Sequence, residues 1–530
     1  MKKLALMAIA AITAFGIAAS AQLTPDRKLR MVQGLIDTYY VDTVNSDKIA
    51  EEAIIAMLGA LDPHSVYSDA EETKALTEPL QGNFSGIGIQ FNMLQDTLYV
   101  IQTIAGGPSE QVGVRAGDRI IAANDTAISG VKMSNADIIK RLRGPKGSVV
   151  NIDVARRGQP APLHFRIVRD DIPLYSVDAA YMAAPATGYI RISRFAADTP
   201  KEFAQAFNKL RKQGMRDLII DLEDNGGGYL GAAVEMANNF LRHNDVIVYT
   251  KGRNTPDQYF RAEGNGKMLD GRVVVMVNEY SASASEILSG ALQDNDRGVV
   301  VGRRTFGKGL VQRPFPFPDG SMIRLTVSRY YTPAGRSIQK PYEAGDGDDY
   351  SMDLKRRFDN GELTSADSIH FADSLRYETL RNHRTVYGGG GIMPDRFVPI
   401  DTMSVTPYYR ELRAKNAFNQ YAIDYVEANR DSLKALYPTE QAFIDGFSFT
   451  PEMMDGFTAT AEKLGVTADT AQPEKVTEAI STILTGLIAR DLFESGTYYR
   501  VVNKLNPVYR EALRIIGSPY EYDRLLSNGK

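Results

Sequence analysis

The chain has 530 residues, of which 43% are hydrophobic and 24% charged, and it carries a formal net charge of -4 at pH 7. At about 150 residues per domain, this length predicts three or four units, and the small net charge favours neither nucleic acid nor an anionic membrane as a partner. The sequence contains no cysteine, which excludes disulfides, thiolate nucleophiles and iron–sulfur clusters.

The first residues have the pattern of a secretory signal peptide. Two lysines precede an apolar stretch over residues 4–18, and a small-residue cleavage site ends at Ala21. The apolar stretch is shorter than the ~20 residues that span a bilayer, which disfavours a membrane anchor. We expect a signal peptide over residues 1–21, cleavage after Ala21 and export to the periplasm or cell envelope, without stable membrane insertion.

The segment over residues 22–83 has a helical pattern. Ile49, Ala53 and Met57 follow one another at a spacing of four, which predicts one apolar face of a helix. This segment carries no catalytic signature, and His64 has the context of a local hydrogen-bonding residue. We expect a small N-terminal helical unit.

Residues 84–170 change to short strands separated by glycines, which predicts a small β domain. Within it, Gly86, Ile87, Gly88 and Ile89 form a glycine-flanked turn. Successive N–H groups in such a turn can cradle a carboxylate.

Residues 171–340 alternate apolar strands with amphipathic helices, which predicts an α/β layer structure with a largely parallel sheet. Residues 341–386 are polar and are expected to form a surface insertion, after which residues 387–402 return to the core. Residues 403–530 have a helical pattern and predict a separate module. Its amphipathic helices need a surface for their apolar faces, so a homo-oligomer or an adaptor partner stays open beside a core of their own.

The segment Val299–Gln312 has the glycine spacing of a phosphate-binding loop, with Gly302, four residues and then Gly307 and Lys308. Such a loop needs a serine or threonine after the lysine and a helix to follow. Here Gly309 follows, and the next residues have the pattern of a strand and a turn. Nucleotide binding is therefore disfavoured, and Lys308 needs another explanation.

Three serines, Ser281, Ser283 and Ser285, stand between an apolar strand and an amphipathic helix. One interpretation is structural, since Ser283 and Glu286 have the spacing of a capping box. The other is catalytic, because the N–H groups at a helix N-terminus favour a developing oxyanion. The residues alone do not choose among the three serines.

A nucleophilic serine also needs a base. Of the five histidines, only His243 lies in the α/β region, in a polar turn. A lysine serves as a base when burial lowers its pKa and makes the neutral amine available. Lys308, which lies between two glycines after an apolar strand, is the candidate.

Together these motifs resemble the carboxyl-terminal processing proteases, also called tail-specific proteases, over about residues 30–402. The resemblance implies an α/β protease core with an inserted PDZ domain and helical modules at both ends. It also implies a serine endopeptidase that needs no metal or cofactor and binds protein or peptide substrates with free C-termini. The motifs that carry it are SASASEI from Ser281, TFGKGLVQ from Thr305, DLEDNGGGYL from Asp221, LDPHSVY from Leu61 and GGGGIMPDRFVPID from Gly388.

The resemblance assigns catalytic roles to three residues: Ser283 as the nucleophile, Lys308 as the general base and Gln312 as the residue that orients the lysine. Asp294 aligns with a position that is sometimes given a supporting role, but its polar context predicts a solvated helix residue. The alternative from another functional class is a non-catalytic PDZ scaffold or chaperone of the cell envelope.

For the oxyanion hole, the resemblance implies the N–H of Ala284 and a glycine N–H, that of Gly228 rather than Gly227. The chain departs from the family pattern in the same turn. Glu223 and Asp224 stand where family members often have arginine and asparagine.

Overall fold

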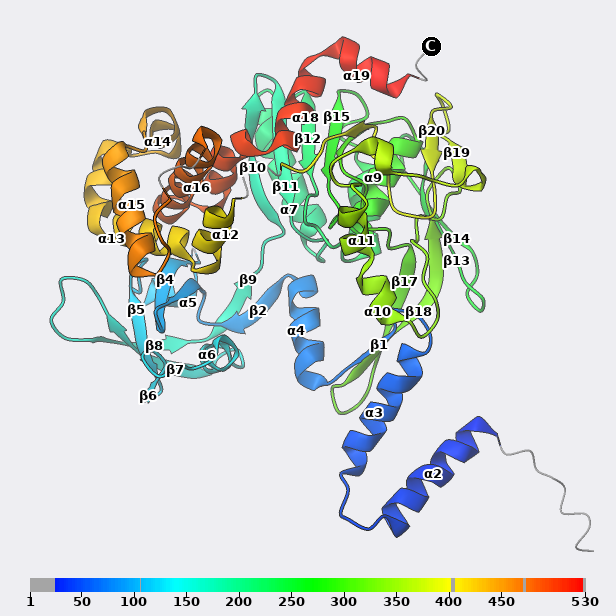
Figure 1. The fold of residues 1–530 in the computed structure, drawn as a ribbon, viewed down its shortest axis with the longest axis horizontal. Helices are drawn as coiled ribbons and strands as arrows, with labels where there is room; N and C mark the ends of the chain where they lie inside the picture. The colour runs from blue at the N-terminus through cyan, green and yellow to red at the C-terminus, as the bar shows by residue number, and fades with distance from the viewer. Residues whose placement is uncertain (1–23, 105, 402–405, 470–472, 528–530) are drawn as a thin grey trace, which may run out of the picture.

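The computed structural model describes residues 24–104, 106–401, 406–469 and 473–527, and the predicted signal peptide lies outside them. The described chain forms an α/β core, a small β domain and helical segments at both ends, which confirms the predicted fold class (Figure 1). Within these residues, no helix combines the length and the apolar character needed to cross a membrane.

The centre of the core is a six-stranded sheet. In sheet order its strands are β10 (Val177–Ala184), β11 (Thr187–Ile192), β12 (Asp217–Asp221), β15 (Val273–Val277), β16 (Val299–Gly302) and β21 (Arg396–Phe397). The pair β10 and β11 is antiparallel, and all other neighbours are parallel. Both β12 and β15 are buried along their whole length, as expected for a parallel sheet that is covered on both faces.

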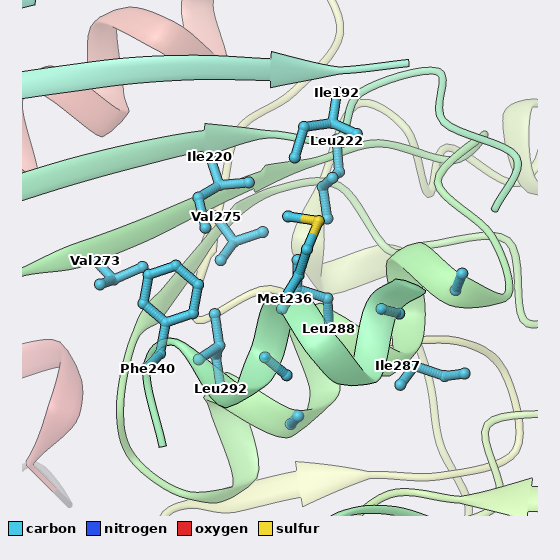
Figure 2. Close-up of a cluster of buried hydrophobic side chains, with 14 of the residues drawn as sticks. Ile192, Ile220, Leu222, Met236, Phe240, Val273, Val275, Ile287, Leu288 and Leu292 are labelled. Carbon is cyan, nitrogen blue, oxygen red and sulfur yellow. The ribbon is translucent and has the colours of Figure 1, made fainter. Parts of the chain in front are cut away.

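Helices of the core cover one face of this sheet. They are α7 (Thr199–Lys212), α8 (Leu230–Asn238) and α9 (Ala284–Asp294). Figure 2 shows Met236 of α8 and Leu288 of α9 packed against Ile220 and Val275 of the sheet. Because α8 follows β12 and α9 follows β15, the turns that precede the two helices lie at the same edge of the sheet.

The last helices of the chain pack on the opposite face. They are α17 (Ser495–Val502), η3 (Asn503–Leu505), α18 (Pro507–Gly517) and α19 (Pro519–Leu526). Ile515 and Tyr522 belong to the same buried cluster as Val274 of β15. The Tyr522 hydroxyl accepts from the Val273 N–H at 3.0 Å and lies 3.2 Å from the Val273 carbonyl. These helices are therefore part of the α/β core.

The preceding helices of the C-terminal region form a bundle with a core of their own. They are α12 (Pro407–Ala414), α13 (Ala417–Leu436), α14 (Glu440–Gly446), α15 (Pro451–Lys463) and α16 (Glu474–Leu492). The sequence predicts residues 403–530 as one helical module. In the structure, one part of this region forms the bundle and the other part packs on the sheet of the core.

A second, antiparallel sheet lies beside the first. It comprises β1 (Val66–Ser68), β18 (Met322–Tyr331), β13 (Val246–Lys251), β14 (Gln258–Arg261) and β17 (Leu310–Pro316). Strand β16 ends in the first sheet and β17 begins in the second. Residues 303–309, here named the lysine loop, connect the two sheets.

In the chain, the small β domain follows α4 (Ala70–Gln81) and precedes the first strand of the core, β10. It has its own buried cluster. Strand β3 lies at the edge of its sheet, and the cluster Leu94, Ile101 and Ile423 joins the domain to α13. Its elements are β2 (Asn83–Gly86), β3 (Ile89–Leu94), β4 (Thr97–Thr103), α5 (Pro108–Gln111), β5 (Arg119–Ala123), β6 (Thr126–Ala127), α6 (Asn135–Leu142), β7 (Val149–Ala155), β8 (Leu163–Val168) and β9 (Asp170–Pro173).

The N-terminal helices α2 (Pro25–Tyr39) and α3 (Ser46–Gly59) extend from the body of the molecule (Figure 1). No residue of α2 is buried, and only Leu58 of α3 is. The apolar face predicted through Met57 is therefore not packed, since the Met57 side chain is 55% exposed.

The insertion over residues 341–386 is not a surface appendage. It buries Tyr350 and Arg357, and Arg384 pairs with Asp296 and Asp395 of the core. Its elements are α10 (Gly347–Ser351), α11 (Asp353–Asp359), η1 (Ala366–Ser368), η2 (Asp373–Leu375), β19 (Arg376–Glu378) and β20 (Thr385–Tyr387).

Candidate active site

The three serines at the start of α9 differ in environment. Ser281 and Ser285 are fully buried, and their hydroxyls donate to the carbonyls of Leu222 at 2.7 Å and Asn225 at 2.8 Å. Ser283 is partly exposed. The hydroxyls of Ser281 and Ser285 thus have structural partners, and Ser283 is the serine that a substrate can reach.

Ser283 has a strained backbone, with φ of 54° in the left-handed region that favours glycine. A non-glycine residue in this region costs about 1–3 kcal/mol and persists only where the surrounding structure holds it. Here the Ser283 N–H donates to Glu286 Oε2 at 2.8 Å, which is the carboxylate half of the predicted capping box. The Tyr330 hydroxyl lies 3.1 Å from the Ser283 carbonyl oxygen. Both contacts hold Ser283 at the start of α9.

The glycine turn, residues 225–228, lies against Ser283. A Cβ on Gly227 would stand 2.8 Å from the Ser283 Cβ, and one on Gly228 would stand 2.1 Å from the Phe195 carbonyl. Only glycine fits at these two positions, where φ is 101° and 146°. The Gly227 N–H donates to Asn225 Oδ1 at 2.9 Å. The N–H groups of Gly228 and Ala284 donate to no acceptor in the described chain and are free for an oxyanion.

The two departures from the family pattern anchor this turn. The Asp224 N–H and carboxylate exchange hydrogen bonds with the Asn278 side chain at 3.0 and 2.8 Å. Glu223 is buried and accepts from Asn506 Nδ2 at 2.6 Å. Burial and the nearby Asp221 charge raise the pKa of Glu223 to about 8. The C-terminal helices therefore contact the turn that presents the glycine N–H.

Lys308 lies in the lysine loop, and its side chain is partly buried. Burial, together with the positive charge of Arg324, lowers its pKa to about 8, against the opposing charges of Glu286 and Asp62. At this pKa a sizeable fraction of the amine is neutral near physiological pH. The phosphate-loop alternative fails, because β17 rather than a helix follows Lys308.

Glu286 joins the serine to the lysine loop. Its carboxylate is completely buried and accepts four hydrogen bonds. The donors are Ser283 N at 2.8 Å, Lys308 N at 2.9 Å, Gly307 N at 2.7 Å and Thr305 Oγ1 at 2.5 Å. Burial raises its pKa to about 7, and these hydrogen bonds oppose the rise. The sequence predicts Glu286 as a helix cap only; its second set of partners lies about twenty residues away.

Gln312 Nε2 donates to Thr326 Oγ1 at 3.2 Å, and Thr326 Oγ1 donates to Asp62 Oδ1 at 2.9 Å. No hydrogen bond joins Gln312 to Lys308, or Lys308 to Ser283, in the described structure. Lys308 precedes β17, whereas Gln312 lies within it. The Gln312 amide oxygen has no partner within the described residues and can accept from the lysine.

Two further residues near the site were not predicted as functional. His64 Nε2 lies 2.9 Å from the Tyr350 hydroxyl of the insertion. Burial and the Lys308 charge lower the pKa of His64 to about 4, so its ring is neutral. Asp62 fixes the same segment through Ser65, whose hydroxyl donates to Asp62 Oδ2 at 2.6 Å.

Asp294 differs from its prediction. It is fully buried rather than solvated, and it pairs with Arg336 at 2.6 Å. Arg336 is also completely buried, so each charge compensates the other. Asp294 is a structural residue of the core.

In the β domain, the turn Gly86–Ile89 leads into the edge strand β3, which pairs only with β4 within the described sheet. The Ile87 carbonyl accepts from the Ser109 N–H at 3.0 Å and from its hydroxyl at 2.6 Å. The left-handed φ of Gly88, 73°, shapes the turn. An edge strand beside such a turn can accept an extended peptide as an additional strand. Among the described residues, no group of three or more His, Asp and Glu side chains is placed to hold a metal ion.

Three family models match the chain. Peptidase family S41 matches residues 186–346, a PDZ domain matches residues 85–165, and a family of unknown function, DUF8443, matches residues 408–494. The last match falls on the bundle of α12 to α16.

Named relatives match more than half of the chain. The carboxy-terminal processing protease CtpB of Bacillus subtilis is 35% identical over 61% of this chain and 68% of its own. The carboxy-terminal-processing protease of Bartonella bacilliformis is 36% identical over 57% of this chain and 70% of its own. Among solved structures, the photosystem II D1 C-terminal processing protease aligns at 31% identity with a TM-score of 0.35, over 59% of this chain and 83% of that chain.

Proposed function

Because the chain belongs to the carboxy-terminal processing proteases of peptidase family S41 and is therefore a serine endopeptidase, we propose that Ser283 and Lys308 carry out its catalysis. The observation that carries this proposal is the carboxylate of Glu286, which accepts from the N–H groups of both residues. One buried group thus holds the nucleophile and the base in a common frame.

In the proposed reaction, the neutral amine of Lys308 takes the proton of the Ser283 hydroxyl while Oγ attacks the scissile carbonyl. The N–H groups of Ala284 and Gly228 stabilise the oxyanion of the tetrahedral intermediate. Lys308 then gives its proton to the leaving amine, and an acyl-enzyme remains. Water, activated by Lys308, releases the new C-terminus and restores Ser283. The pKa of about 8 supports this role, because both protonation states of Lys308 are accessible.

Gln312 is proposed to orient Lys308 through its amide oxygen. Its Nε2 is held by Thr326, which leaves the oxygen for the amine. A glutamine held in this way is not ionised at any pH in the working range, so it orients the lysine without competing for the proton.

Substrate recognition is proposed to use the PDZ domain, with the terminal carboxylate of an unfolded tail in the turn Gly86–Ile89 and the tail added to β3. Fluorescence anisotropy of labelled peptides on the full chain with Ser283→Ala tests this. We expect a peptide with a free C-terminus to bind at least tenfold more tightly than its C-terminal amide. Equal affinity for the two peptides contradicts a carboxylate site.

The cleavage test uses an unfolded protein with an apolar C-terminal tail, analysed by mass spectrometry. Ser283→Ala and Lys308→Ala should each lower the rate by about 10³-fold or more, as expected for loss of a nucleophile or base. Ser285→Ala, in the first turn of α9, is the matched control, and its rate should fall less than tenfold. Unchanged cleavage by either of the first two variants contradicts the proposed site.

Export to the periplasm or cell envelope is also proposed, on the strength of the signal-peptide pattern over residues 1–21. N-terminal sequencing of the protein from cell fractions tests it. The expected mature chain begins at Gln22 in the envelope fraction. A chain that retains residues 1–21 in the cytoplasm contradicts the proposal.

A further inference from the structure

The lysine loop is held from two sides. On one side Glu286 accepts from the N–H groups of Gly307 and Lys308. On the other side the insertion, residues 341–386, contacts the backbone of the same loop. The residue pattern of this insertion indicates no functional role.

Arg357 of α11 makes the closest of these contacts. Its guanidinium donates to the Arg304 carbonyl at 2.6 Å and to the Thr305 carbonyl at 3.1 Å. The residue is only 2% exposed, so its hydrogen bonds to the two carbonyls are shielded from water. A guanidinium presents two parallel donors, whereas an ammonium is a point charge. Arg357 therefore fixes two consecutive peptide groups at the start of the lysine loop.

Tyr350 of α10 makes a second contact. Its ring packs edge-on against Phe306 of the loop, with centroids 6.1 Å apart, and against His64, with centroids 5.2 Å apart. The ammonium of Lys340 lies 4.1 Å from the Phe306 centroid and 4.0 Å from that of Tyr350. The backbone N–H of Lys340 also donates to the Gly307 carbonyl at 2.9 Å. The four consecutive residues 304–307 of the loop are thus each in contact with a group from the insertion or with Lys340 directly before it.

These contacts bear on the geometry of the base. Lys308 lies three residues after Thr305 and directly after Gly307, where φ is 89° and the absence of a side chain leaves the backbone conformationally permissive. A displacement of about 1 Å in a catalytic group can lower a rate by about 10²-fold. Contacts that fix the peptides before Lys308 are therefore expected to act on the chemical step.

We propose that the insertion positions the catalytic lysine, with Arg357 and Tyr350 as positioning residues that hold the lysine loop against α9. This inference rests on the proposed role of Lys308 as the base. Both residues are buried and lie outside contact with a substrate, so their effect falls on kcat rather than on KM.

The experiment measures kcat, KM and the pH profile of kcat/KM for Arg357→Lys in the full mature chain. We expect kcat to fall 10- to 100-fold with KM changed less than threefold. Loosening of the loop hydrates Lys308 and raises its pKa, so the acid limb of the profile should move to higher pH. Tyr350→Phe, which keeps the ring contacts and removes the hydrogen bond between the hydroxyl and His64 Nε2, should lower kcat three- to tenfold.

The matched control is Arg384→Lys. Arg384 is another buried arginine of the insertion, and it also donates to a backbone carbonyl, that of Gln293 at 2.9 Å, but it does not contact the lysine loop. We expect a comparable fall in Tm, with kcat changed less than threefold and an unmoved pH profile. If Arg357→Lys does not fold, kcat and the pH profile of Tyr350→Phe test the proposal instead.

Two outcomes overturn the inference. One is an Arg357→Lys or Tyr350→Phe enzyme with wild-type kcat and pH profile, while Lys308→Ala is inactive. The other is an equal loss of kcat in Arg357→Lys and Arg384→Lys without a shift of the acid limb, which indicates a merely structural role. Retained cleavage by Lys308→Ala instead overturns the proposed base, whatever the insertion variants show.

Discussion

In the serine half of the candidate site the backbone sets the geometry, whereas in the lysine half side chains do so. The serine half lies on two turns at one edge of a single sheet, with Gly227 and Gly228 packed against Ser283 and Phe195. The lysine loop crosses between two sheets and is held by Glu286 and Arg357. The comparison teaches that the serine half is sensitive to added atoms and the lysine half to altered charge and hydrogen bonding.

Among the variants that test this comparison, the largest effect is expected from an added methyl group in the glycine turn. In Gly228→Ala the new Cβ would stand 2.1 Å from the Phe195 carbonyl, so the turn must move and its N–H leaves the oxyanion. Loss of one such donor lowers kcat by about 10²- to 10³-fold. Gly226→Ala is the control, because its Cβ meets no atom within 4 Å. Steady-state kinetics measure both variants. Equal losses of kcat in the two would contradict the claim that the backbone sets the geometry of the serine half.

Glu286→Gln tests the connection between the halves. A glutamine has a single acceptor oxygen, so donors among Ser283 N, Lys308 N and Gly307 N lose their partner. Each unsatisfied buried donor costs about 1–3 kcal/mol, and kcat should fall about 10- to 100-fold.

The same variant has a predicted pH signature. The Glu286 charge raises the pKa of Lys308, so its removal should move the acid limb of kcat/KM to lower pH. Glu235→Gln on the exposed side of α8 is the control. An acid limb that stays in place or moves to higher pH would show that Glu286 does not act on the lysine through its charge.

Arg324→Gln tests the lysine half alone. Burial first and then the Arg324 charge lower the pKa of Lys308, so removing this charge raises that pKa above about 8. Less of the amine is then neutral at pH 7, and kcat/KM should fall there by up to about tenfold for one pKa unit and recover above pH 9. Arg329→Gln, exposed on the same strand, should leave the profile unchanged. A loss that is equal at all pH values contradicts the electrostatic explanation.

The smallest effect on activity is expected at the far face of the sheet. Tyr522→Phe removes the hydroxyl that contacts Val273, which should lower the free energy of unfolding by about 1 kcal/mol and leave kcat unchanged. Denaturant titration and kinetics check this, with the exposed Tyr520→Phe as the control. A change in kcat would mean that the C-terminal helices act on the site, for example through Asn506 and Glu223.

Several site residues could be predicted because their signals are local. The strand, turn and helix around Ser283 and the two glycines beside Lys308 are visible in short stretches. The choice of Ser283 over Ser281 and Ser285 came from the family resemblance, since all three carry the same hydroxyl. The structure gives a physical reason for the choice, because the other two hydroxyls donate to the carbonyls of Leu222 and Asn225, about sixty residues earlier.

Other residues could not be predicted because their partners are distant in the chain. Asp294 lies in a polar stretch and was expected in solvent, but Arg336, which is 42 residues later, buries it. The apolar pattern of α3 predicted a packed face, yet Met57 is exposed. A periodic pattern states that a face is apolar and does not state what covers it.

By itself the sequence determined the alternation of strands and helices, the glycine turns and the serine and lysine positions, since each depends on neighbouring residues. Only the tertiary structure decided which hydroxyl is exposed, which N–H groups are free and which carboxylate joins the two halves. It also placed Arg357 of the insertion on the lysine loop. The physical reason is that burial and buried hydrogen bonds are properties of several segments together, and no single segment specifies them.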